Sequence, residues 1–136
     1  MSHIKSIDKV ILWLKKRGWD VFFYTDAPEV CVWSRKQVHI NSRTHPETRL
    51  YTLLHECGHI LVDDNRDRIH RLSYRSHSEG MYNLARDKRV AMLSEEYEAW
   101  KRGEKLARRL RIEIDVKKFD RHRSVALMSY INWASD

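Results

Sequence analysis

The chain has 136 residues, of which 42% are hydrophobic and 33% are charged, and its formal net charge is +7. This length is typical of one domain with one core, so we expect a single domain over residues 1–136. The sequence has no apolar run near the roughly 20 residues of a membrane-spanning helix, no signal-peptide pattern, and only two cysteines. These features argue against a membrane protein and against a disulfide-rich secreted protein, and we expect a cytoplasmic location.

Basic charge is concentrated in two segments of the chain. Residues 101–123 hold ten Lys and Arg against four Asp and Glu, and residues 64–90 hold seven against four. Such an excess would attract nucleic acid or an acidic partner through phosphate contacts and counterion release. Because no nucleic-acid-binding motif accompanies the charge, we favour solvated helix faces and keep nucleic-acid binding as the alternative.

The first half of the chain predicts a helix, a small sheet and a second helix. Apolar residues at helical spacing indicate a helix over residues 3–17, which Gly18 is well placed to end in the left-handed conformation. Three short β-like runs follow at residues 21–24, 30–33 and 37–40, and the last two are separated as in a hairpin. The second helix should begin near residue 46.

The second half predicts an excursion and two more helices. Residues 64–90 are polar and without strong apolar periodicity, so we expect a long excursion, with a helical piece near residues 81–85. Helices should follow at about 90–110 and 116–133. Their expected core positions are Leu93, Tyr97, Trp100, Leu106 and Leu110, then Phe119, Val125, Ala126, Leu127, Tyr130 and Ile131. A small antiparallel or mixed sheet packed on helices gives an α+β class.

One motif in the second helix carries chemistry, the run from His55 to His59, which reads H-E-x-x-H. Residues four apart lie on one helix face about 6 Å apart, so both imidazoles can bind one Zn²⁺. Glu56 lies about 100° around the helix, where its carboxylate can act as a base on a zinc-bound water. Two buried histidines without a metal would each need another hydrogen-bond partner, so we favour the metal site.

A catalytic zinc needs a third protein ligand and an open coordination position. We predict Glu98, on the next helix beside the small Ala99, as this ligand. Glu95 shares its face and is the second choice, whereas Glu96 should point elsewhere. The alternative is that these acids only pair with basic neighbours such as Arg102.

Three other residues near the motif are weaker candidates for the metal site. His70 and His77 lie in the polar excursion and are alternative third ligands. Asp63 continues the helical row of the histidines, but it lies about 12 Å along the axis from the first of them. We therefore expect Asp63 to orient His59 and not to bind the metal.

The sequence around the motif resembles the ImmA/IrrE group of zinc metallopeptidases. The matching residues are the strand-like run 38–41, which ends in Asn41, the helix 49–61 with its H-E-x-x-H motif, and the later pair Glu98-Ala99. The resemblance implies a zincin-like helical core with the acid of the Glu-Ala pair as third ligand. It also implies a phage or prophage setting, and a repressor-type protein as substrate.

These observations predict a zinc-dependent peptidase in which Glu56 activates the attacking water. Tyr74, His77, Tyr82 and Tyr97 are candidate donors to the oxyanion, and the sequence does not choose among them. One alternative is a non-catalytic regulatory module that retains the metal-site helix and binds protein or nucleic acid. Another is a zinc hydrolase that acts on a non-peptide amide. The oligomeric state stays open.

Overall fold

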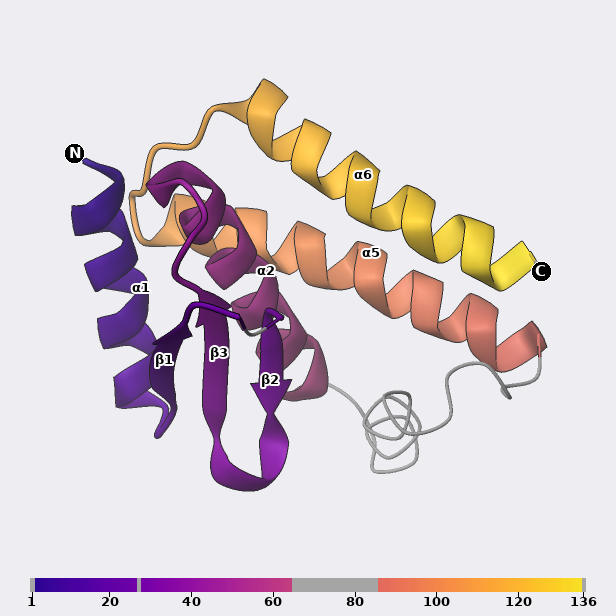
Figure 1. The fold of residues 1–136 in the computed structure, drawn as a ribbon, viewed down its shortest axis with the longest axis horizontal. Helices are drawn as coiled ribbons and strands as arrows, with labels where there is room; N and C mark the ends of the chain where they lie inside the picture. The colour runs from indigo at the N-terminus through magenta and orange to yellow at the C-terminus, as the bar shows by residue number, and fades with distance from the viewer. Residues whose placement is uncertain (1, 27, 65–85, 136) are drawn as a thin grey trace.

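The fold is a small mixed sheet packed on helices, which confirms the predicted α+β class. The computed structural model describes residues 2–26, 28–64 and 86–135. The elements in chain order are α1 (His3–Lys16), β1 (Asp20–Tyr24), β2 (Val30–Val32), the 3-10 turn η1 (Trp33–Arg35), β3 (Gln37–Asn41), α2 (Pro46–Asp64), α5 (Arg86–Arg109) and α6 (Val116–Ser135) (Figure 1).

Helix α1 begins and ends where the sequence predicts. The Ser2 side chain accepts a hydrogen bond of 3.2 Å from the backbone N–H of Lys5, which caps the first turn. At the other end, Gly18 has a φ of 83°, a left-handed conformation that glycine adopts without steric cost. The face that carries Val10 and Leu14 is fully buried.

The sheet is mixed, with strand order β1-β3-β2. Strand β1 runs parallel to β3, and β2 runs antiparallel to β3, with Cys31 opposite Val38. The hairpin between β2 and β3 turns through η1 and Lys36, whose φ is 50°. Alternate residues of β3, Val38 and Ile40, are fully buried, so one face of the central strand faces the core.

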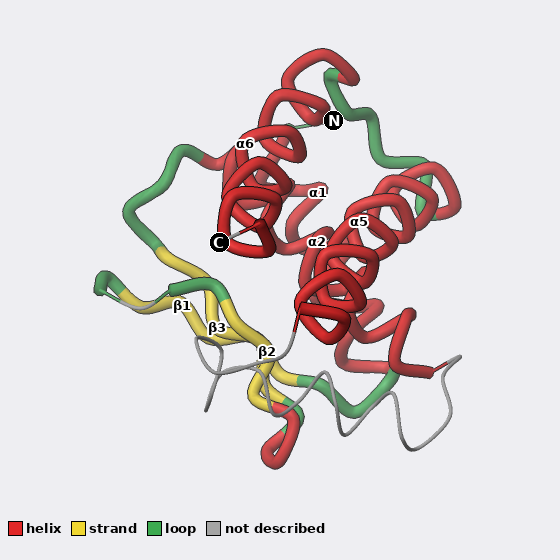
Figure 2. The backbone as a smooth tube through the Cα atoms, turned by 90° about the vertical axis from the view of Figure 1, so that its right-hand side faces the viewer, coloured by secondary structure: helices red, strands yellow, loops and turns green. Residues whose placement is uncertain are grey.

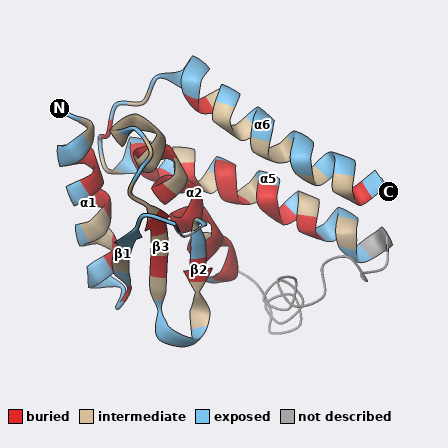
Figure 3. Cartoon of the chain, in the orientation of Figure 1, coloured by how far each residue is buried: buried red, intermediate tan, exposed pale blue. Residues whose placement is uncertain are grey.

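Helix α2 is the centre of the molecule. It contacts α1, β2 and β3 on one side and packs along α5 on the other, and α6 packs against α5 (Figures 1 and 2). Most residues from Leu50 to Asp63 are buried, as the largely buried α2 in Figure 3 shows. A polar motif in this helix is therefore enclosed between two layers of the fold. Among the described residues, no helix has the length and apolarity that crossing a membrane requires.

Two sequence predictions about the helices need correction. Helix α5 begins at Arg86 and not near residue 90, so the predicted excursion over 64–90 ends earlier. Residues 65–85, with the helical piece expected at 81–85, lie outside the described residues. Tyr97, Val125 and Ile131 were expected in the core but are 53%, 69% and 42% exposed. Tyr97 and Ile131 line an open apolar groove between α5 and α6, and no described segment covers Val125.

Candidate metal centre

The site is built where α2 and α5 cross at very short distance. A Cβ placed on Gly58 would lie 1.8 Å from the carbonyl oxygen of Ala99. One on Gly103 would lie 2.5 Å from the carbonyl oxygen of Leu54. Both glycines therefore let the backbone of one helix touch the other. This approach brings side chains on the neighbouring turns of the two helices within reach of one another.

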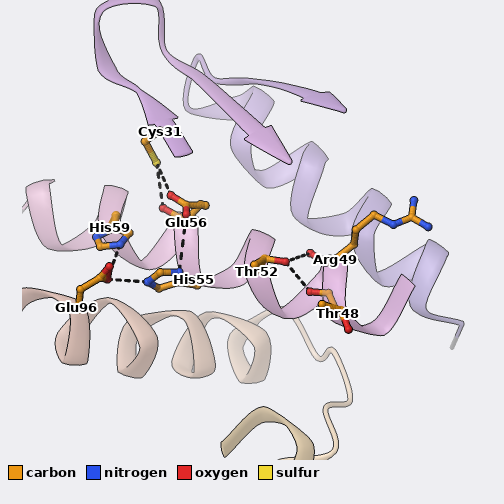
Figure 4. A network of polar contacts seen from close by, with 8 residues as sticks. All are labelled: Cys31, Thr48, Arg49, Thr52, His55, Glu56, His59 and Glu96. Carbon is orange, nitrogen blue, oxygen red and sulfur yellow. Dashed lines mark hydrogen bonds and ion pairs between the residues drawn. The ribbon is translucent and has the colours of Figure 1, made fainter. Parts of the chain in front are cut away.

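Three ligand-type side chains converge beside this crossing. Nε2 of His55 and Nε2 of His59 each lie 2.9 Å from Oε2 of Glu96 (Figure 4). One ligand atom from each residue lies within 4.8 Å of the others. All three residues are buried, with exposures of 9%, 4% and 5%. Two imidazole nitrogens and a carboxylate oxygen thus surround one point.

The ring of His55 is held by an aromatic neighbour. Trp100 of α5 stacks on it with 4.2 Å between ring centroids and 9° between the planes. Trp100 in turn meets Phe119 of α6 edge-to-face at 5.5 Å. The stack restricts the orientation of the imidazole plane and so holds Nε2 in the direction of Glu96.

The charges in the cluster are strongly coupled. Burial of Glu96 opposes its ionisation, but His59 and His55 beside it hold the pKa of this carboxyl well below its usual range. Burial of the His59 ring opposes its protonation, yet the charge of Glu96 and the hydrogen bond to it raise the pKa of His59. An anionic carboxylate is therefore stabilised in a place where it would otherwise be costly.

Glu56 of the motif lies on the side of α2 that faces the hairpin (Figure 4). Its Oε1 is 3.8 Å from Nδ1 of His55. Its Oε2 accepts a hydrogen bond from the thiol of Cys31, with Sγ at 3.2 Å. Glu56 is buried, with an exposure of 5%. Its carboxylate lies beside His55 but is not one of the three grouped ligand atoms.

The structure places Glu96, and not the predicted Glu98, beside the two histidines. Glu98 points away from the histidines and pairs with Arg102, with Oε1 3.1 Å from Nε. Glu95, the second choice, is buried but does not belong to the group of three that the described residues form. Glu96, which was expected to point elsewhere, takes the place of both. The alternative pairing of an acid with Arg102 is the one realised at Glu98.

A sequence signal for Glu96 was present. The residues of α5 that pack on α2 recur at steps of four and three. They are Met92, Glu96, Ala99, Gly103 and Leu106, all buried. Small residues at 99 and 103 mark the line of closest approach, and counting back one turn from Ala99 leads to Glu95 and Glu96, both of which are buried. The prediction of Glu98 used the small neighbour correctly but placed the acid beside it instead of one turn away.

A tyrosine that was expected only in the core lies next to the cluster. Burial raises the pKa of the Tyr130 hydroxyl of α6, and the charge of Glu96 and a hydrogen bond to it raise it further. Among the oxyanion candidates, Tyr97 is exposed, and Tyr74, His77 and Tyr82 lie outside the described residues, as does His70. Asp63 is buried on α2, and its role toward His59 stays a prediction.

Comparison with known proteins gives one match. The model of the Peptidase_M78 family, described as the IrrE N-terminal-like domain, matches residues 14–90. The matched stretch includes His55, Glu56 and His59, and it ends before Glu96. No curated protein and no solved structure matches the chain. The third member of the cluster therefore rests on the geometry of α5 alone.

Proposed function

The chain belongs to the Peptidase_M78 family of IrrE N-terminal-like domains, and from this premise we propose that it is a zinc metallopeptidase that hydrolyses a peptide bond in a protein substrate. One observation carries the proposal: both histidine Nε2 atoms lie 2.9 Å from the same oxygen of Glu96. Two imidazoles and one carboxylate are a ligand set of catalytic zinc sites that keep a fourth position open.

The residues present fit a divalent metal ion. Three ligand atoms of the right chemistry lie within 4.8 Å of one another, and all three side chains are buried. In the structure both histidines pair with Glu96, and a cation between the three groups would accept lone pairs from all of them at once. His55, His59 and Glu96 would hold the ion, and imidazole with carboxylate suits zinc.

A zinc ion held there would lower the pKa of a water molecule and polarise the carbonyl of the scissile bond. Residues of the chain would transfer the proton of the attacking water. Glu56 would accept a proton from the attacking water through Oε1 and deliver it to the leaving amine nitrogen as the C–N bond breaks. Trp100 would keep the His55 ring in its plane, and burial under the helices would restrict the entry of other water.

Tyr130 is our candidate donor to the oxygen of the tetrahedral intermediate, in addition to the four candidates that the sequence suggests. Its support is the hydrogen bond to Glu96, which places a hydroxyl beside the cluster. A neutral phenol is a suitable donor to developing negative charge. We also propose that the substrates are proteins, with repressor-type regulators among them. This part of the proposal follows from the family resemblance.

Cleavage can be tested before the substrate is identified. The purified full chain, loaded with zinc, is incubated with a native cell extract, and newly formed protein N-termini are labelled and identified. We expect new N-termini with the wild type and none with Glu56→Gln, although both variants bind equal zinc. Equal patterns from the two proteins would contradict the proposal. Retained zinc and partner binding with no new N-termini in either would favour the regulatory alternative.

A further inference from the structure

Cys31 makes a contact that a core-filling residue does not need to make. Its Sγ lies 3.2 Å from Oε2 of Glu56 and 3.6 Å from the backbone carbonyl oxygen of the same residue (Figure 4). Both residues are buried, with exposures of 9% and 5%. The edge strand β2 is thereby joined to the acid of the H-E-x-x-H motif through a side chain.

The thiol has one proton and two acceptors within reach. The carboxylate oxygen is nearer than the carbonyl oxygen and carries charge, and hydrogen bonds to ionised acceptors are the stronger ones. Burial, together with the negative charge of Glu56, raises the pKa of the Cys31 thiol. The sulfur therefore keeps its proton and acts as the donor toward Oε2.

The strand fixes the position of this donor. Cys31 is the middle residue of β2 and pairs with Val38 of the central strand, which is fully buried. Its neighbours Val30 and Val32 are more exposed than Cys31, as the alternation of a strand requires. The thiol thus stands on a hydrogen-bonded ladder and not on a mobile loop.

We propose that Cys31 is a positioning residue that holds Oε2 of Glu56 and so turns Oε1 toward the ring of His55. The proposal rests on the proposed function for its catalytic meaning. A carboxylate with one oxygen held by a fixed donor has fewer orientations, and the other oxygen then lies 3.8 Å from Nδ1 of His55. A general base works only when it is within reach of the proton it takes.

Cys57 offers a matched control on the same helix. It is the other cysteine of the chain, is likewise free and buried, and directly follows Glu56. Successive helical residues diverge by about 100°, so the two thiols meet different surroundings. Any effect that comes only from the loss of a buried thiol should appear equally at both positions.

Infrared spectroscopy of the S–H stretch tests the contact without any substrate. Cys57→Ala leaves only the Cys31 band, and Cys31→Ala leaves only the Cys57 band. Adding Glu56→Gln to each replaces a charged acceptor with a neutral one. We expect the Cys31 band to shift to higher frequency because its hydrogen bond weakens, while the Cys57 band stays in place. An unchanged Cys31 band, or equal shifts of both bands, would overturn the proposal.

Hydrolysis kinetics test the positioning role. The probe is a peptide that spans the most abundant new N-terminus produced by the wild type in cell extract. We expect Cys31→Ala to lower kcat about tenfold with KM and zinc content unchanged, the size of one lost hydrogen bond to a charged group. Cys31→Ser, which restores a donor, should recover to within about threefold, and Cys57→Ala should stay near the wild type.

The two proposals fail in different ways. A wild-type kcat in Cys31→Ala, or no recovery in Cys31→Ser with folding and zinc content intact, would overturn the positioning role alone. If the wild type cleaves nothing, the proposed function fails, and the infrared comparison still decides whether Cys31 holds Glu56.

Discussion

The carbonyl oxygen of Ala99 lies where a side chain at residue 58 would have to begin. A Cβ on Gly58 would come within 1.8 Å of it, and within 2.6 Å of the carbonyl carbon. Both atoms belong to backbone, so neither can move aside as a flexible side chain would. The distance between α2 and α5, and with it the reach from Glu96 to the histidines, depends on this glycine.

Replacing Gly58 with Ala should destabilise the protein. Alanine in a helix is normally better than glycine by about 1 kcal/mol, but the clash should outweigh this gain and lower the free energy of unfolding by about 2–3 kcal/mol. Urea unfolding measures the change, and zinc content of the folded variant reports on the spacing of the ligands. Gly103→Ala, with its nearest contact at 2.5 Å, should cost less. Stabilisation by either variant would contradict the close crossing.

Trp100 should contribute to stability and to zinc binding through its aromatic ring and not through its indole N–H. Its Nε1 is buried and has no hydrogen-bond partner among the described residues. Trp100→Phe keeps an aromatic face on His55 and removes the unsatisfied donor, so we expect a loss of less than about 1.5 kcal/mol. Trp100→Ala should cost about 3–5 kcal/mol and weaken zinc binding, because the imidazole loses its stacking partner. Thermal unfolding and zinc titration of both variants test this, and equal zinc affinity in the two would argue against the orienting role.

We expect the protein to lose stability at alkaline pH because the buried Tyr51 hydroxyl has a raised pKa. Its buried hydroxyl donates to Glu47 and accepts from the N–H of Asp115, and burial is the main reason that its pKa is raised to about 12. The unfolded state releases this proton near pH 10, so it binds fewer protons than the folded state between the two values. The contribution of Tyr51 is therefore fully present below about pH 10 and is lost as the pH rises toward 12.

Tyr51→Phe isolates this contribution. The variant should be less stable by about 1–2 kcal/mol at neutral pH, because two hydrogen bonds are lost. The difference between the two proteins should shrink as the pH rises through this window, while other titrations cancel. Urea unfolding over the alkaline range measures it. A difference that stays constant with pH would show that Tyr51 is not the group responsible.

The local structure could be predicted because it depends on local signals. Apolar spacing and Gly18 define α1, and the H-E-x-x-H spacing places His55 and His59 on one face of α2. The side chains that the structure brings to them come from far along the chain. Such long-range partners depend on how α5 is rotated about its axis, which the sequence shows only through the small residues Ala99 and Gly103.

The errors have the same physical origin. Two residues along a helix are about 200° of rotation, so a misjudged contact face exchanges Glu96 for Glu98. Val125 was expected in the core because it is apolar and at helical spacing, but the structure leaves it exposed. Periodicity reports which residues share a face, and packing decides which face is covered. The contact between Cys31 and Glu56 had no sequence signal, because a lone cysteine in a strand is typical of a core residue.

The identity of the third ligand is the central claim, and zinc content tests it most directly. The wild type, Glu96→Gln and Glu98→Gln are purified under the same conditions, saturated with zinc, freed of excess ion and analysed for bound metal. We expect about one zinc per chain in the wild type and in Glu98→Gln, and a large loss in Glu96→Gln. Full zinc in Glu96→Gln together with its loss in Glu98→Gln would contradict the site described above.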